Sequence, residues 1–289
     1  MRNRLFCFGM GYTAQALAAE LHAEGWVIAG TVRDPSAHAD LTSRGWSIFR
    51  FQSDGPLDVP ADALAGTTHL LASVPPDAAG DPVLLHHAGD IAALGGLLWA
   101  GYLSTTGVYG DRQGGEVDEA SERAAASQRG RRRVAAEDAW LDLWREHGVP
   151  IHLFRLAGIY GPGRNALETV RQGRARRIHK QGQVFGRIHR DDIVTTLRAS
   201  MARPNPGAAY NLADDEPAPP DEVIAHACEM LGVEPPPLQE FEAVKDSLSP
   251  MARSFYGESK RVSNRRIKEE LGVALRWPNY REGLKGLLR

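Results

Sequence analysis

The residues Gly9, Met10, Gly11, Tyr12, Thr13 and Ala14 form the pattern GxGxxA, which suits the binding of a dinucleotide. The first glycine permits a tight turn, and the second lets the backbone approach a pyrophosphate. The small Ala14 lets a helix pack on a strand, and the first amides of that helix face the phosphates. The pattern therefore predicts a dinucleotide site, with a plain structural turn as the alternative.

The end of the second expected strand, residues 30–34 (GTVRD), would decide which nicotinamide cofactor is bound. Sites that prefer NAD usually carry an acid there, which accepts a hydrogen bond from the adenosine ribose. The strand tip here has no acid, and the guanidinium of Arg33 could pair with a ribose 2′-phosphate. The sequence favours NADP; NAD, with Asp34 as the ribose ligand, is the alternative. Ser73 ends a further strand and is expected along the cofactor.

Alternating strands and helices position these residues. We expect strands over residues 5–8, 26–32, 47–51, 68–74, 101–105 and 150–156, and helices over 14–22, 87–99 and 132–146. Such alternation favours an α/β fold with a Rossmann-type, doubly wound parallel sheet. Residues 111–130 show no period and are expected to form a mobile loop.

The pattern changes beyond Gly163 to a small α+β lobe. A short helix is expected first, followed by a hairpin over 177–188, a helix over 192–201, a strand over 209–212, and helices over 221–231 and 264–271. Residues 1–160 are interpreted as the dinucleotide-binding domain and residues 161–289 as a substrate-binding lobe. That lobe is not expected to fold independently and can return elements to the first domain.

Three further segments carry a family resemblance. Residues 103–110 (LSTTGVYG) look like the SS-or-ST-xx-VYG segment of the extended short-chain dehydrogenases/reductases of the epimerase/dehydratase type. Residues 155–163 (RLAGIYGPG) resemble that family's R-x-x-N-x-Y-G-P, and residues 187–192 (RIHRDD) resemble its H-V-x-D stretch. The resemblance implies an NAD(P)-binding oxidoreductase that acts on a small hydroxyl or carbonyl compound, nucleotide- or sugar-linked.

In that family a Ser or Thr, a Tyr and a Lys perform the chemistry. Thr105 falls on the Ser/Thr position and would orient the substrate. Counting back from Glu137 places the family's lysine at Arg133 and its tyrosine at Arg129. An arginine cannot release a proton at physiological pH, so Arg129 cannot replace the tyrosine. Arg133 could still hold the nicotinamide ribose. Tyr109 is the candidate proton donor, with a role in the site wall as the alternative.

The matched segments also imply substrate-binding residues: Arg155, Tyr160 and Arg187. Arg155 could instead be a structural arginine tied to Asp191 or Asp192. These two aspartates stand at the start of a helix, where an N-cap role is the simpler interpretation.

No metal site is predicted. His86 and His87 would point in different directions on a helix, and the acidic run at 211–216 lacks the glycine and distal glutamate of a calcium loop. The basic run at 129–133 could face phosphates or be a solvated helix start. The cluster at 174–180 is interpreted as exposed surface, with a wall of an anionic substrate site as the alternative. Nucleic-acid binding is not expected, because no flanking aromatics or known module accompany these runs.

Composition fits an ordinary soluble protein, with 43% hydrophobic and 24% charged residues and a net charge of -2. Two distant cysteines, Cys7 and Cys228, are interpreted as buried packing residues. The N-terminal apolar run is broken by glycine, so neither a signal peptide nor a membrane span is expected. We expect a cytoplasmic protein with a small-molecule substrate.

Two functions follow from these observations. The leading interpretation is an NADP-binding, epimerase/dehydratase-like oxidoreductase with an atypical active site. The alternative is a non-catalytic dinucleotide-binding regulatory module, because both the tyrosine and the lysine are replaced. A homodimer through the helix over 132–146 is a further expectation. Its apolar contact would come from Ala135, Ala136, Ala139 and Trp140, which could pack on the sheet instead.

Overall fold

The computed structural model describes residues 2–288 of the chain. Internal contacts divide the chain into two compact units. The first contains the residues up to Thr105, Arg131–Arg155 and Leu197–Tyr210, and the second contains Thr106–Gly130, Leu156–Thr196 and the residues from Asn211 onward. A single cut at residue 160 does not reproduce this division, because the chain crosses between the units several times.

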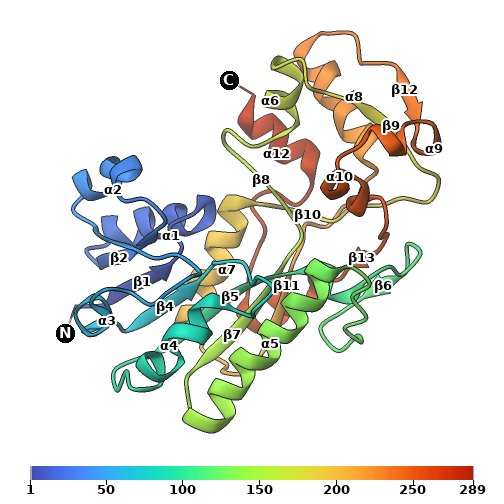
Figure 1. The fold of residues 1–289 in the computed structure, drawn as a ribbon. Helices are drawn as coiled ribbons and strands as arrows, with labels where there is room; N and C mark the ends of the chain where they lie inside the picture. Colours follow the sequence, from blue (N-terminus) through green and yellow to red (C-terminus); the bar gives the residue numbers. More distant parts are fainter. Residues whose placement is uncertain (1, 289) are drawn as a thin grey trace. The chain divides into compact units, whose positions relative to one another are not determined.

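A seven-stranded sheet with the order β11-β7-β5-β4-β1-β2-β3 organises the first unit. Its strands are β1 (Arg4–Phe8), β2 (Val27–Val32), β3 (Ser47–Arg50), β4 (His69–Ala72), β5 (Trp99–Thr105), β7 (Ile151–Leu156) and β11 (Ala209–Leu212). The pairs β1–β2, β1–β4, β2–β3 and β4–β5 are parallel. The order runs outward from β1 in both directions, which confirms the expected doubly wound sheet (Figure 1).

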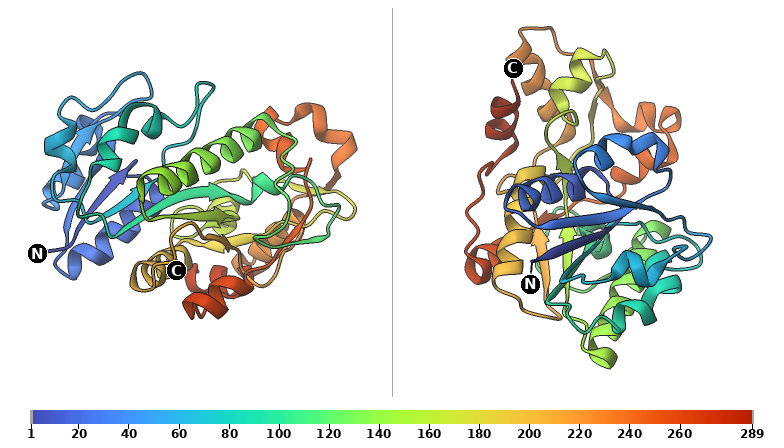
Figure 2. Two further views of the ribbon diagram at one scale, coloured as in Figure 1. Left: turned by 90° about the horizontal axis from the view of Figure 1, so that it is seen from below. Right: turned by 90° about the vertical axis from the view of Figure 1, so that its left-hand side faces the viewer.

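Helices cover both faces of this sheet (Figure 2). Phe6 and Phe8 of β1 share a buried cluster with Val83 of α4 (Pro82–Ala92) and with Trp140 of α5 (Gln128–His147). On the other face, Arg198 of α7 (Arg190–Ala202) pairs with Glu20 and Glu24 of α1 (Tyr12–Ala23). Short elements complete the connections: η1 (Ser36–His38), α2 (Ala39–Ser43), α3 (Pro60–Leu64) and η2 (Thr106–Tyr109).

The expected helix over 87–99 was wrong at both ends. Helix α4 begins five residues earlier, because the Asp81 carboxylate caps the amides of Val83 and Leu84 and Pro82 occupies the first turn. It ends at Ala92, and Trp99 already belongs to β5. An apolar run cannot show by its periodicity alone where a buried helix gives way to a buried strand.

Helix α5 uses its apolar residues on two different faces. Ala136 and Trp140 are buried in the sheet cluster, whereas Ala135 and Ala139 are exposed. The Trp140 indole also donates a hydrogen bond to the Asp81 carboxylate at 3.2 Å. Two of the four residues expected at a dimer contact therefore pack on the sheet.

The second unit combines short parallel strand pairs with short helices. The pairs are β8 (Gly158–Tyr160) with β10 (Arg187–His189), β9 (Arg177–His179) with β12 (Leu238–Glu240), and β6 (Glu116–Val117) with β13 (Arg261–Val262). Its helices are α6 (Ala166–Arg171), α8 (Pro220–Leu231), α9 (Phe241–Val244), η3 (Lys245–Ser247), α10 (Pro250–Phe255), α11 (Arg265–Leu271) and α12 (Tyr280–Leu287). Leu167, Val223 and Leu284 lie in one buried cluster that joins α6, α8 and α12.

Two expectations for this unit were wrong. A turn does occur at Gly182, but β9 and β10 do not pair with each other as a hairpin, since each is taken by another strand. The supposed mobile loop over 111–130 contains β6 and is held by the chain around Ser259. The Ser259 carbonyl accepts hydrogen bonds from the amides of Arg112 and Gly114, and its own amide donates to Asp111. Long-range pairing of this kind leaves no periodic signal in a short polar segment.

The glycines of α12 permit close packing. A Cβ at Gly283 would overlap the Tyr160 hydroxyl. We expect Gly283→Ala to lower the free energy of unfolding by about 1–3 kcal/mol, because overpacking outweighs the gain of about 1 kcal/mol in helix propensity. Gly89→Ala in α4 is the matched control. It meets no atom within 4 Å and should stabilise the protein. Urea denaturation of both variants checks this, and equal effects would contradict the packing argument.

Buried histidines make the first unit sensitive to acid. The His152 Nε2 accepts the amide of Asn205 at 2.8 Å, so its Nδ1 donates to the Ala100 carbonyl. Burial lowers the pKa of His152 to about 4, and that of His69 also to about 4. Both residues therefore contribute stability that is complete above pH 6.5 and is lost as the pH falls toward 4.

We expect each of these histidines to account for about 2 kcal/mol of lost stability between pH 7 and pH 5. His152→Gln keeps a neutral donor and acceptor and should make the pH dependence of the unfolding free energy shallower by that amount. Denaturation curves at the two pH values test this. If the pH dependence of the unfolding free energy is the same in His152→Gln, the pKa of His152 does not differ between the folded and unfolded states.

Among residues 2–288, no helix combines the length and the apolar character needed to cross a bilayer.

Candidate functional site

The glycine loop lies between β1 and α1, as its pattern predicted, and two neighbouring strands clamp it. The Gly9 amide donates to the Thr31 hydroxyl at 2.9 Å, and the Met10 amide donates to the Thr31 carbonyl at 2.7 Å. From the end of β4, the Ser73 hydroxyl donates to the Gly9 carbonyl at 2.7 Å. The loop therefore has a fixed position on the sheet before any ligand arrives.

Gly9 and Gly11 serve different purposes. Gly9 has φ +89°, and a Cβ there would lie 2.7 Å from the Ser73 hydroxyl, so only glycine fits the fold. Gly11 has φ −82°, which any residue adopts, and a Cβ there would meet no described atom within 4 Å. Gly11 is exposed, so the backbone at this position is accessible to a ligand.

The start of α1 matches this interpretation. Gly11 is the N-cap, and the helix has neither a side-chain cap nor an acidic residue in its first turn. Such a helix end attracts phosphate through its amides and its dipole. Thr13 and Ala14 are buried, as expected for the residues on which the helix packs, and Tyr12 is half-buried. The residues present therefore fit the pyrophosphate of a dinucleotide.

Sequence reasoning missed two residues that support the loop, Gly30 and Thr31 of β2. A Cβ at Gly30 would lie 2.8 Å from both the Cys7 carbonyl and the Met10 side chain. The glycine in this strand therefore lets the loop rest on β2. A glycine inside a strand pattern is a known sign of close backbone approach, and this signal was present in the sequence.

Two charged residues, Arg33 and Asp34, follow the end of β2, and the Asp34 carboxylate is already hydrogen-bonded. Arg33 is exposed. The Asp34 Oδ1 accepts the Ser36 hydroxyl at 2.6 Å and the Ser36 amide at 3.0 Å, which lowers the pKa of Asp34. Asp34 is therefore engaged in a local turn, while the guanidinium of Arg33 extends into solvent.

The two positions that the sequence assigns to the family's tyrosine and lysine differ in environment. Arg129 is exposed. Arg133 donates to the Leu103 carbonyl at 2.7 Å and to the Tyr102 hydroxyl at 3.0 Å, so its Nη1 atom is directed at β5. Thr105 is half-buried at the end of that strand. Arg133 is therefore held against β5 through this atom, and its contact with a nicotinamide ribose stays a prediction.

Arg155 has a different partner from the aspartates expected for it. Its guanidinium lies 2.8 Å from Glu137 of α5, and both side chains are buried. Glu137 also accepts the Ser104 hydroxyl at 2.6 Å. Glu137 of the helix thus gives Arg155 a structural ion pair within the first unit.

Tyr109 lies in the second unit and is fully buried. Its hydroxyl donates to the side-chain Oδ1 of Asn211 at 2.7 Å. The backbone amide of Asn211 donates to the Glu119 carboxylate, also at 2.7 Å. Burial raises the pKa of Glu119. This chain of contacts favours the wall role for Tyr109 over that of proton donor.

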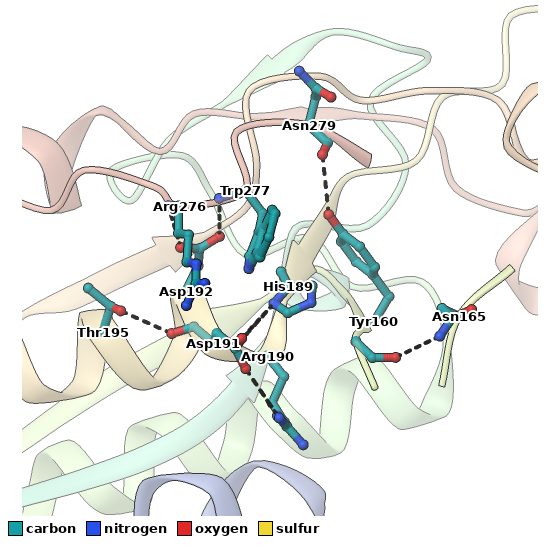
Figure 3. A network of polar contacts seen from close by, with 11 residues as sticks. Tyr160, Asn165, His189, Arg190, Asp191, Asp192, Thr195, Arg276, Trp277 and Asn279 are labelled. Carbon is teal, nitrogen blue, oxygen red and sulfur yellow. Dashed lines mark hydrogen bonds and ion pairs between the residues drawn. The ribbon is translucent and has the colours of Figure 1, made fainter. Parts of the chain in front are cut away.

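Tyr160 and Arg187 are each held by polar contacts within the second unit, and Figure 3 shows those of Tyr160. The Tyr160 hydroxyl donates to the Asn279 carbonyl at 3.3 Å, and its ring contacts His189 edge-on. The Arg187 guanidinium donates to the carbonyls of Phe185 and Ala218. These contacts give both residues a structural role, which the matched segments alone did not indicate.

Asp192 does not cap its helix as expected. Its carboxylate accepts the amides of Arg276 at 2.7 Å and Trp277 at 3.0 Å, which fixes the C-terminal segment to α7 (Figure 3). The Asp191 amide instead donates to the His189 Nδ1 at 3.2 Å. Burial lowers the pKa of His189 to about 4, so this residue is neutral at physiological pH.

The other polar clusters do not converge on a metal. His86 contacts the Ser53 carbonyl and His87 accepts the Leu57 amide, so the two residues hold one loop from different directions. Within the acidic run, Asp215 pairs with Lys268 and Glu216 with Arg281. No group of three or more potential metal ligands occurs in the described part of the chain. In the cluster 174–180, Arg176 contacts Gln239 and Lys180 donates to the Tyr256 carbonyl.

Comparison with known proteins places the fold in a class. No family model matches the chain. The dTDP-glucose 4,6-dehydratase of Bacillus anthracis, solved in complex with NAD, has a TM-score of 0.81 at 12% identity and covers 100% of this chain and 96% of its own. The resemblance to extended short-chain dehydrogenases/reductases of the epimerase/dehydratase type is thus confirmed for the fold.

Two proteins are similar in sequence over nearly their whole length. A conserved protein of unknown function from Silicibacter pomeroyi is 49% identical with a TM-score of 0.89, covering 99% of this chain and 98% of that one. Protein YeeZ of Escherichia coli K12 is 27% identical, over 94% of this chain and 95% of YeeZ. The chain belongs to the same family as the Silicibacter pomeroyi protein.

Proposed function

We propose that the chain binds NADP at the glycine loop and acts as an oxidoreductase on a hydroxyl or carbonyl compound, nucleotide- or sugar-linked. One observation carries the proposal: Thr31 and Ser73 clamp the loop, while its exposed Gly11 leaves the backbone open, since a Cβ there would meet no atom of residues 2–288 within 4 Å beyond its chain neighbours and its own helix backbone. The likeness to a dTDP-glucose dehydratase solved with NAD supports both the cofactor class and the substrate class. The free, buried cysteines suit a reducing cytoplasm.

The cofactor would supply or accept the hydride, and the chain would hold it. Gly9, Met10 and Gly11 form the loop against the pyrophosphate, and Tyr12 begins the helix that faces it. Thr105, at the carboxyl end of β5, orients the substrate through its hydroxyl. With Arg129 in the tyrosine position, we assign no proton donor, and Tyr109 serves as a wall residue.

Calorimetric titration with NADPH and NADH tests the cofactor. We expect NADPH to bind more tightly than NADH. Arg33→Ala should lower the affinity for NADPH by about ten- to a hundredfold, because one charged hydrogen-bonding group is lost. NADH should be affected by less than twofold. Failure of both nucleotides to bind would remove the oxidoreductase proposal.

A specific observation favours a second candidate, a non-catalytic module. Arg133 is directed at Tyr102 and Leu103, and Arg129 is exposed, so neither replaced position supplies the usual acid and its activator. An assay of NADPH-saturated protein with keto-sugar nucleotides separates the two functions. Turnover that Thr105→Ala abolishes supports the enzyme. NADPH-dependent capture of a partner protein, unchanged by Thr105→Ala, supports the module.

A homodimer is a further proposal. The exposed Ala135 and Ala139 would form part of the contact between two copies of α5. Sedimentation of Ala135→Glu against the unmodified protein tests it, and a monomer in both cases would contradict it.

A further inference from the structure

Two arginines come to the same edge of the sheet from neighbouring strands. β2 and β3 lie side by side and parallel, with Val32 opposite Arg50. Arg33 follows Val32 directly, and Arg50 is the last residue of β3. Parallel strands end at the same edge, so both arginines stand at the carboxyl end of the sheet, where ligands of such folds bind.

Gln52 joins the two arginines. Its amide nitrogen donates to the Arg33 carbonyl at 3.3 Å, and its amide oxygen accepts a hydrogen bond from the Arg50 guanidinium, also at 3.3 Å. Gln52 thereby links one nitrogen of the Arg50 guanidinium to the backbone carbonyl of Arg33. The loop after β3 is also held from α4, through the contacts of His86 and His87 with Ser53 and Leu57.

The two guanidinium groups lack a counterion. Both arginines are exposed, and the ion pairs found within residues 2–288 include neither of them. The acid next to them in sequence, Asp34, has its Oδ1 engaged by Ser36. Two positive charges at one edge with no carboxylate partner attract an anion, and guanidinium forks match a phosphate.

The glycine loop is hydrogen-bonded to β2, the strand that Arg33 follows. Thr31 of β2 accepts the amide of Gly9 on its hydroxyl and that of Met10 on its carbonyl. Arg33 lies two residues further along the chain. A dinucleotide whose pyrophosphate rests on the loop would therefore have its adenosine ribose at the end of β2.

We infer that Arg50 and Arg33 together form a clamp for a phosphate monoester on the adenosine ribose, and that Gln52 is the residue that positions Arg50. The inference rests on the proposed function, because the glycine loop must hold the rest of the dinucleotide. It adds a second specificity-determining arginine, from a strand that the sequence pattern did not connect with the cofactor.

Calorimetry with NADPH, NADH and adenosine 2′,5′-bisphosphate tests the clamp. We expect Arg50→Ala to lower the affinity for NADPH and for the bisphosphate by about ten- to a hundredfold. The affinity for NADH should change by less than twofold. Arg44→Ala is the matched control. It removes the same charge at the amino end of β3, where Arg44 pairs with Asp40, and should leave all three affinities unchanged.

Gln52→Met removes the bridge but keeps the side-chain length. We expect the ratio of NADPH to NADH affinity to fall by about threefold to tenfold, whereas a purely structural role would lower both affinities together. Unchanged NADPH affinity in Arg50→Ala, with Arg33→Ala still impaired, would overturn the clamp and leave the proposed function intact. Binding of no nucleotide by the unmodified protein would overturn the proposed function itself.

Discussion

Gly11→Val should fold normally and fail to bind NADPH, with at least a hundredfold loss of affinity. The valine Cβ would meet no described atom within 4 Å beyond its chain neighbours and its own helix backbone, and the backbone at φ −82° accepts any residue. The same space is where a pyrophosphate would approach the loop, so the added side chain would displace it. We expect a stability loss of only about 1 kcal/mol, because valine is a poorer N-cap than glycine.

Gly9→Ala provides the contrast. This alanine would be forced to φ +89° with its Cβ 2.7 Å from the Ser73 hydroxyl, so we expect a loss of about 1–3 kcal/mol in the free energy of unfolding. NADPH titration and urea denaturation of both variants separate the ligand role of Gly11 from the folding role of Gly9. Normal NADPH affinity in Gly11→Val would show that the cofactor does not use this loop.

Removing one partner of the buried pair between Glu137 and Arg155 should destabilise the first unit by about 3–5 kcal/mol. Both side chains are buried, and their closest atoms are 2.8 Å apart. Glu137→Ala would leave the Arg155 guanidinium without this partner and would also deprive the Ser104 hydroxyl of its acceptor.

The double variant Glu137→Leu with Arg155→Met distinguishes the loss of this ion pair from general damage to the core. We expect it to recover most of the lost stability, because two apolar side chains of similar volume remove both charges together. About 1 kcal/mol should remain lost at Ser104. Chemical denaturation measures each variant, and a double variant as unstable as the single ones would show that the pair is not the cause.

Residue patterns within short segments were sufficient to predict the N-terminal half of the fold. The GxGxxA loop, the strands around it and the parallel order follow from short runs whose periodicity and turn residues agree with one another. Gly9 illustrates this agreement, because the turn that the pattern required is the conformation that it adopts.

The pairing of strands that are distant in sequence could not be predicted from these local patterns. β9 and β10 look like the arms of a hairpin, yet β9 pairs with β12, about sixty residues later in the chain. The polar loop after Tyr109 is ordered by β13 and Ser259, from the far end of the sequence. Such contacts depend on which distant segments are brought together, which residue spacing within one segment does not encode.

The sequence by itself determined the class of fold and the position of the glycine loop, and it predicts that Arg129 and Arg133 stand at the family's tyrosine and lysine positions. These depend on residue types within short windows. Only the tertiary structure decided which partners the charged side chains have: it paired Arg155 with Glu137, directed Arg133 toward Tyr102, and placed Arg50 at the same edge of the sheet as Arg33. The physical reason is that a buried or edge charge takes its role from the partner that packing brings within hydrogen-bond distance, and that partner is distant in sequence.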